Sequence, residues 1–130
     1  MKFILLRVTI SKKIATIDYV NIFNSMFNLN NIKTFVYDIF NNYRTNINYN
    51  ILNSIIKCIS TIEINVTKIS NNDTKSISEI NNCINIISNN YYYIETYIDS
   101  ISNEDAVKGL LKAFYKLKEQ VIQELNKKLW

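Results

Sequence analysis

The chain has 130 residues, of which 48% are hydrophobic and 20% are charged, and its formal net charge is +4. This length predicts one domain spanning residues 1–130, with enough apolar residues for a core. The sequence contains no histidine, which excludes the usual Ser-His-Asp and Cys-His forms of nucleophilic catalysis. Its single glycine, Gly109, excludes a glycine-rich loop that would hold a phosphate group.

Isoleucine and asparagine dominate the composition, with 24 and 21 residues respectively. Both have AT-rich codons, as do lysine and tyrosine, so this bias indicates an AT-rich genome, for example that of a DNA virus, a plasmid or a low-GC bacterium. Individual asparagines therefore carry little functional information. The regular spacing of isoleucine between the asparagines favours a folded chain over a disordered asparagine-rich tract.

Targeting and redox signals are weak. The apolar run at residues 3–6 ends at Arg7 and is too short for the core of a signal peptide. No run of apolar residues is long enough to span a membrane. Cys58 and Cys83 lack the spacing of a metal or redox motif, and a disulfide between them is not expected. These features predict an intracellular, reducing location, namely the cytoplasm.

The first half of the chain is predicted to be helical except at its start. Residues 2–10 can form a short strand, because apolar residues alternate there, or a basic N-terminal arm. Helical spacing of apolar residues predicts a helix at about 13–28. A second helix is predicted from the 4,3,4 spacing between Ile32 and Tyr43, after a cluster of asparagines, and residues 44–50 are predicted to be a loop.

Isoleucine recurs with the spacing of a coiled coil between residues 52 and 101. The intervals are 3,4,3,4,3 from Leu52 to Ile69 and 3,4,3,4,3,4,3 from Ile77 to Ile101. The second stripe consists of Ile77, Ile80, Ile84, Ile87, Tyr91, Ile94, Ile98 and Ile101. Such spacing keeps one stripe of a helix against a partner helix, and this periodicity outweighs the strand propensity of isoleucine. We predict helices at 51–69 and 76–101 with both stripes in a dry seam.

A last helix is predicted at 103–129 from apolar residues spaced 3,4,3,4 between Val107 and Val121. The apolar register slips by two residues after Ile101, which favours a hairpin over one continuous rod. Residues 70–75 form a polar turn cluster, and Ser76 and Ser102 are the predicted N-terminal caps of the two long helices. The predicted fold is an all-α antiparallel bundle of four or five helices, whose two long C-terminal helices form a hairpin.

Candidate partner-binding residues lie outside the apolar stripes. They are Ile86, Tyr92, Tyr93, Tyr97 and Trp130. These residues either give a central helix a second buried face or form a surface for a partner or a second copy, for which Tyr and Trp are favoured anchors. We therefore expect a non-enzymatic protein–protein interaction or self-assembly module, without a metal, cofactor or small-molecule substrate.

Two alternative functions are left open by the sequence. The basic N-terminal end and the lysines at 108, 112 and 116 suggest a small nucleic-acid-associated protein, although Tyr115 is the only aromatic residue between them. In length and composition the chain also resembles small viral helical proteins that antagonise host signalling, including poxviral proteins with a Bcl-2-like fold. The Asn-Trp-Gly-Arg segment of the Bcl-2 family is absent.

Overall fold

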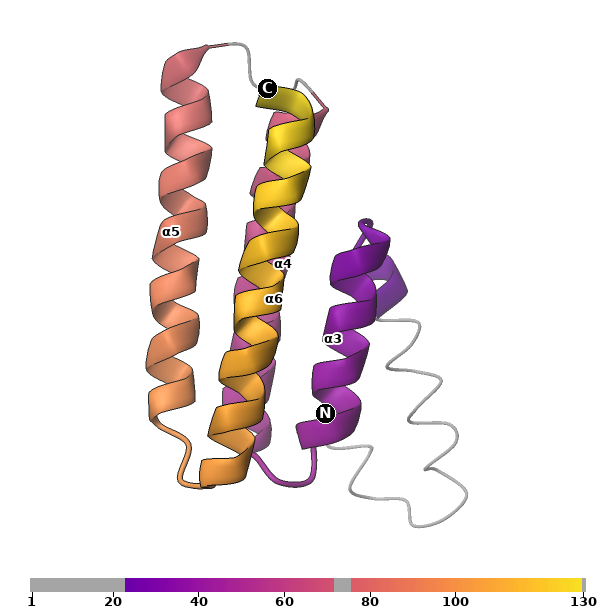
Figure 1. Ribbon diagram of the computed structural model, residues 1–130, viewed down its shortest axis with the longest axis vertical. Coiled ribbons are helices and arrows are strands. Elements are labelled where there is room, and N and C mark those ends of the chain that lie inside the picture. The colour runs from indigo at the N-terminus through magenta and orange to yellow at the C-terminus, as the bar shows by residue number, and fades with distance from the viewer. Residues whose placement is uncertain (1–22, 72–75, 130) are drawn as a thin grey trace.

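The computed structural model describes residues 23–71 and 76–129, and this part of the chain is an antiparallel bundle of α-helices (Figure 1). Its helices are α3 (Asn30–Tyr43), α4 (Tyr49–Ser70), α5 (Ile77–Asp99) and α6 (Glu104–Leu129). Residues 23–26 are also helical, and no described residue belongs to a strand. The predicted all-α class and the C-terminal hairpin of α5 and α6 are confirmed. The region 2–10 and most of the predicted helix at 13–28 lie outside the described residues.

Helix α4 is the central element of the described bundle. It packs against α3, α5 and α6, and its contact with α5 is the most extensive. Figure 1 shows α5 on one side of α4 and α6, and α3 on the other. Every residue of the predicted stripe is buried, namely Leu52, Ile55, Ile59, Ile62, Val66 and Ile69. Since full burial of such a side chain contributes about 1.5–3 kcal/mol, the α4 stripe is a main source of stability.

The stripe predicted in α5 is buried only in its C-terminal half. Ile87, Ile94 and Ile98 are buried, whereas Ile77 is 78% exposed and Ile84 is 36% exposed. The prediction of a dry seam is therefore wrong for the start of this helix. A heptad stripe shifts by about 20° per seven residues around a straight helix, so it turns by about 60° between Ile77 and Ile98. The side of α5 that α4 covers is consequently off the stripe at the helix start.

Side-chain caps fix the starts of three helices. The Ser76 Oγ accepts a hydrogen bond from the Glu79 N–H at 3.1 Å, which confirms the predicted cap of α5. The Asn48 side chain caps α4. For α6, the Asn103 Oδ1 accepts from the Ala106 N–H at 3.0 Å, so the cap predicted at Ser102 is wrong by one residue. Asparagine and serine are about equally good caps, which is why the sequence pattern did not separate them.

Helix α3 is capped by a residue from another helix. Its N-cap residue, Leu29, has no side-chain acceptor. Instead, the Glu63 carboxylate of α4 accepts hydrogen bonds from the Asn28 N–H at 2.9 and 3.1 Å and from the Leu29 N–H at 2.9 Å. Glu63 is only 1% exposed, and a buried carboxylate is costly unless it is hydrogen-bonded. The negative charge also suits the N-terminal end of a helix. Glu63 therefore ties the start of α3 to α4.

The single glycine allows α3 and α6 to approach each other closely. A Cβ atom added at Gly109 of α6 would overlap the hydroxyl group of Tyr43, the last residue of α3. Tyr43 is half-buried and packs against the core. The absence of a side chain at Gly109 therefore makes room for the Tyr43 ring.

We expect Glu63→Gln to lower the free energy of unfolding by about 1–3 kcal/mol, because an NH2 group would replace an acceptor oxygen in front of two backbone donors. Urea denaturation followed by circular dichroism measures the change. Glu119→Gln is the matched control, since Glu119 is an exposed acid on α6, and its effect should stay within about 0.5 kcal/mol. An unchanged unfolding midpoint for Glu63→Gln would contradict the assigned role.

The effect of Gly109→Ala on the free energy of unfolding should change sign with the residue that occupies position 43. In an unobstructed helix the substitution stabilises by about 1 kcal/mol. With Tyr43 present we expect it to destabilise the chain instead, because the new Cβ displaces the ring. In a Tyr43→Leu background it should stabilise. The four proteins of this double-mutant cycle are compared by urea denaturation, and equal effects in both backgrounds would show that Tyr43 does not constrain position 109.

Candidate interaction surface on α5 and α6

Exposed large hydrophobic side chains gather on two helices. Of the seven among the described residues, six belong to α5 and α6 and one, Ile64, belongs to α4. The six are Ile77, Ile84, Tyr92, Tyr93, Tyr115 and Ile122. Since α4 and α5 contain seven isoleucines each, isoleucine content alone does not explain this distribution.

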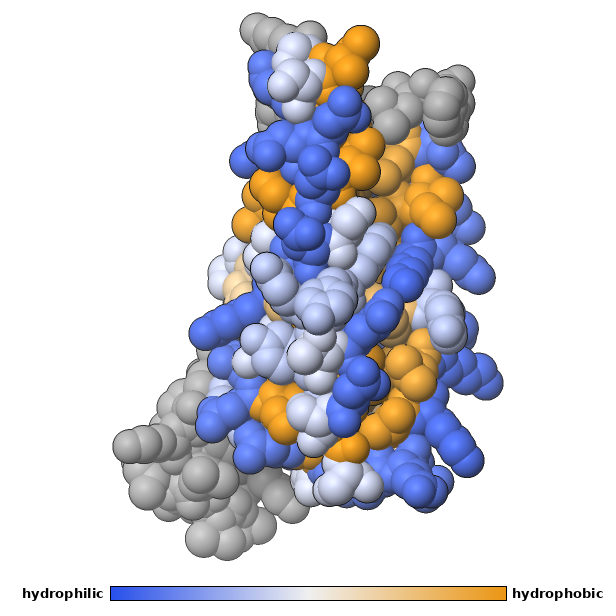
Figure 2. Space-filling model, turned by 90° about the vertical axis from the view of Figure 1, so that its left-hand side faces the viewer, coloured by the Kyte–Doolittle hydropathy of each residue, from blue (hydrophilic) through white to orange (hydrophobic). Residues whose placement is uncertain are grey.

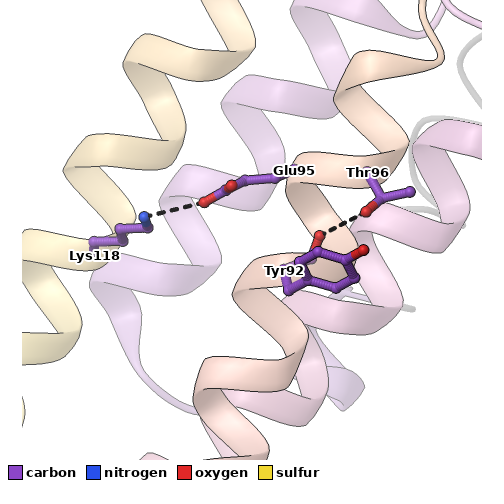
Figure 3. Close-up of polar contacts among 4 residues, drawn as sticks. All are labelled: Tyr92, Glu95, Thr96 and Lys118. Atoms are coloured by element: carbon purple, nitrogen blue, oxygen red, sulfur yellow. Dashed lines mark hydrogen bonds and ion pairs between the residues drawn. The ribbon is translucent and has the colours of Figure 1, made fainter.

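The contact between α5 and α6 is small compared with that between α5 and α4. In this contact the rings of Tyr91 and Phe114 meet edge to face, with their centroids 5.7 Å apart. The Lys118 Nζ lies 3.4 Å from the Glu95 Oε1. Figure 3 marks this ion pair with a dashed line. The same ammonium group is 5.3 Å from the Tyr91 ring centroid and 4.5 Å from that of Phe114, within the range of a cation–π contact. We call these four residues the Tyr91–Lys118 cluster.

Beyond this cluster, toward the start of α5, apolar residues of both helices are uncovered. Ile84 and Ile77 precede Tyr91 by seven and fourteen residues, which places them on the same side of α5 within about 40°. Ile122 follows Lys118 by four residues and shares its side of α6. In Figure 2, where the α5 side of the molecule faces the viewer, apolar side chains (orange) are visible along the upper part of the near helix. We define the α5–α6 strip as Ile77, Ile80, Ile84, Ile122 and Leu125, of which Ile80 and Leu125 are half-buried.

The predicted partner-binding residues lie elsewhere on α5. Ile86, Tyr93 and Tyr97 share the side opposite to the strip, because they are spaced by seven and four residues. Tyr93 is 48% exposed, whereas Ile86 and Tyr97 are half-buried, and Tyr97 packs against the core. Tyr92 is 67% exposed, and its ring meets that of Tyr93 edge to face at 6.1 Å. Trp130 lies outside the described residues. The structure thus brings four of the five candidates together.

Tyr92 differs in orientation from the residues that contact α6. In Figure 3 Glu95 extends from α5 toward Lys118, whereas the Tyr92 ring projects from another side of the helix. The Tyr92 carbonyl accepts a hydrogen bond from the Thr96 hydroxyl at 3.0 Å, which is a bond within the helix. The exposed ring of Tyr92 is therefore available for contact with another molecule.

Sequence reasoning missed the α5 part of the strip. It placed Ile77 and Ile84 in a buried seam, and both are exposed. The signal that could have identified them is the length of the heptad run, because a stripe that spans three heptads on a straight helix cannot face one straight neighbour throughout.

Groups capable of acid–base, nucleophilic or metal chemistry do not converge in the described residues. No group of three or more His, Cys, Asp or Glu side chains there could hold a metal ion. Cys58 and Cys83 are free and buried, and burial raises the pKa of the Cys58 thiol, which lowers its thiolate fraction. An apolar core cavity of about 10 Å³, lined by Phe35, Ile59 and Ile94 among others, has room for one water molecule at most.

No helix within residues 23–71 and 76–129 has both the length and the hydropathy needed to cross a bilayer.

Comparisons of the chain with protein-family models, with curated proteins and with solved structures found no match. The exposed side chains of α5 and α6 are therefore the basis for assigning a function.

Burial within the Tyr91–Lys118 cluster raises the pKa of Tyr91 from 10.0 to about 12. The neutral phenol of Tyr91 is therefore favoured over the phenolate more strongly in the folded state than in the unfolded state. The stabilisation is complete below pH 10 and is lost as the pH rises toward about 12. Titration of tyrosinate absorbance should show a late component that is absent from Tyr91→Phe and retained in Tyr92→Phe, the exposed control. Identical titration curves for the wild type and Tyr91→Phe would contradict this assignment.

Proposed function

We propose that this chain is a non-enzymatic protein–protein interaction module that binds through the α5–α6 strip and through the exposed Tyr115, which precedes Ile122 by seven residues and shares its side of α6. The observation that carries the proposal is the concentration of exposed large hydrophobic side chains on α5 and α6. Covering one isoleucine contributes up to about 1.5–3 kcal/mol. Several such residues on one face provide the apolar centre of an interface, and tyrosines are favoured anchors beside it.

The scaffold favours this role because the strip lies on two helices that pack on the core. Ile87, Ile94 and Ile98 fix α5 on the core, while Leu110 and Leu117 do the same for α6. The exposed residues of the strip therefore project from two anchored helices and not from loops. A preorganised surface loses little conformational entropy on binding, which leaves more of the apolar contact energy for affinity.

A nucleic-acid ligand is the second candidate, and one observation favours it. Lys108, Lys112 and Lys116 are exposed at intervals of four residues along α6. Three acids of the same helix, Glu104, Asp105 and Glu119, are also exposed and reduce the positive field. A salt titration separates the candidates, because phosphate contacts weaken log-linearly with salt concentration, whereas an apolar interface changes little.

Single charge substitutions test the proposed surface. Ile84→Glu and Ile122→Glu each place an unpaired carboxylate in the strip, and both sites are exposed enough to accept it in the folded chain. We expect chemical crosslinking in the producing cells, read by mass spectrometry, to show at least about tenfold less crosslinked complex for both variants. Ile64→Glu is the matched control, since Ile64 is 49% exposed on α4. Equal recovery of complex from all four proteins would refute the proposal.

A further inference from the structure

Helices α5 and α6 carry opposite net charges. α5 contains Glu79, Glu95 and Asp99 and no basic residue, which gives a formal charge of −3. α6 contains six lysines and four acids, which gives +2. Of the three acids of α5, Glu79 lies on the side away from the strip and Glu95 is paired with Lys118, so Asp99 is the acid that α5 offers beside the strip. An acid on α5 and a base on α6 are complementary to a second copy, provided that each helix meets the opposite helix of the other copy.

The contacts between α5 and α6 fix which of their residues lie at the same level along the bundle. Tyr91 contacts both Phe114 and Lys118. The two helices are antiparallel, so residues later in α5 are level with residues earlier in α6. Asp99 follows Tyr91 by eight residues and is therefore level with residues 106–110, which precede 114–118 by eight. Lys108 is in the middle of that range. Moving seven residues the other way, to Ile84, corresponds to residues 121–125, which include both α6 members of the strip.

The surface therefore has an apolar end and a charged end. At the apolar end, Ile84 is level with Ile122 and both are exposed. At the charged end, Asp99 is level with Lys108, and both side chains are exposed. Asp99 follows Glu95 by four residues and Lys108 precedes Ile122 by fourteen, so each lies within about 40° of a residue on the side where its helix adjoins the other. Neither residue forms an ion pair with another described residue.

We infer that the α5–α6 strip binds a second copy of this chain about a two-fold axis parallel to the helices, an inference that rests on the proposed function. Such an axis keeps the levels aligned and sets α5 of each copy beside α6 of the other. Ile84 then meets Ile122 of the second copy, and Asp99 meets its Lys108. An axis perpendicular to the helices would instead set α5 against α5 in opposite directions. Ile84 of one copy would then lie at the level of Asp99 of the other. Charge and apolar matching therefore select the parallel axis.

The full chain tests this inference by sedimentation velocity and light scattering over a wide range of concentrations. The expected result is a concentration-dependent species of twice the chain mass of 15.3 kDa. Ile84→Glu should remain monomeric at concentrations where the wild type and the Ile64→Glu control form dimers. Circular dichroism of each variant confirms that its helical content is unchanged.

Charge reversal tests the orientation of the two copies. Asp99→Lys alone and Lys108→Asp alone should each weaken the dimer by about tenfold, because every contact occurs twice in a two-fold interface. The combined variant Asp99→Lys/Lys108→Asp should restore the affinity to within about threefold of the wild type. Restoration is specific to this pairing, since a general loss of stability would be larger in the combined variant.

The outcomes separate this inference from the proposed function. A chain that stays monomeric throughout, yet still loses a crosslinked partner protein on Ile84→Glu substitution, would overturn self-association and leave the proposed function standing. A dimer that is insensitive to Ile84→Glu would overturn the assigned surface. A dimer that Ile84→Glu disrupts and the charge reversals leave unchanged would overturn the two-fold arrangement inferred above.

Discussion

The broad apolar face of α4 is the constraint on which the described structure depends. Adjacent positions such as Ile55 and Ile56 are both buried, and consecutive helical residues point about 100° apart. One neighbouring helix cannot cover a face of this width, so α3, α5 and α6 must all pack on α4. Glu63, on the same helix, adds a polar contact that fixes the start of α3. Apolar burial thus determines how α3, α5 and α6 pack on α4, and the Glu63 carboxylate fixes the N-terminal end of α3.

The exposed strip on α5 and α6 follows from this arrangement. Because α5 packs mainly on α4, its buried side is the one that α4 covers, and Cys83 and Asn90 lie on that side although both are one residue off the heptad stripe. The Tyr91–Lys118 cluster is the point where α6 does reach α5. Ile77 and Ile84 lie on the α6 side of the helix but before the cluster, where this contact does not cover them. The same packing that stabilises the bundle therefore leaves an apolar surface.

The elements were predictable from spacing and capping residues, because both act within a few residues of sequence. The stripe of α4 and the Ser76 cap are examples. What depends on a neighbouring helix was not predictable, because the spacing defines a stripe but not how much of it a partner covers. Glu63 shows this most clearly, since its hydrogen-bond partners lie 34 and 35 residues away. Its one sequence signal is that it is the sole acid between Asp38 and Asp73, set between two isoleucines.

Composition alone does not account for the isoleucines exposed in the strip. Asparagine and isoleucine have similarly AT-rich codons, so a biased genome does not choose between them at a given position. The start of α5 places asparagine at the exposed positions 81, 82 and 85 and isoleucine at the exposed positions 77 and 84. The two isoleucines are seven residues apart and therefore share the side of α5 that adjoins α6. Asn82 and Asn85 lie about 80–160° away from that side, and Asn81, which follows Ile77 by four residues, borders it. The exposed isoleucines therefore share one side of the helix, as the proposed interaction surface requires.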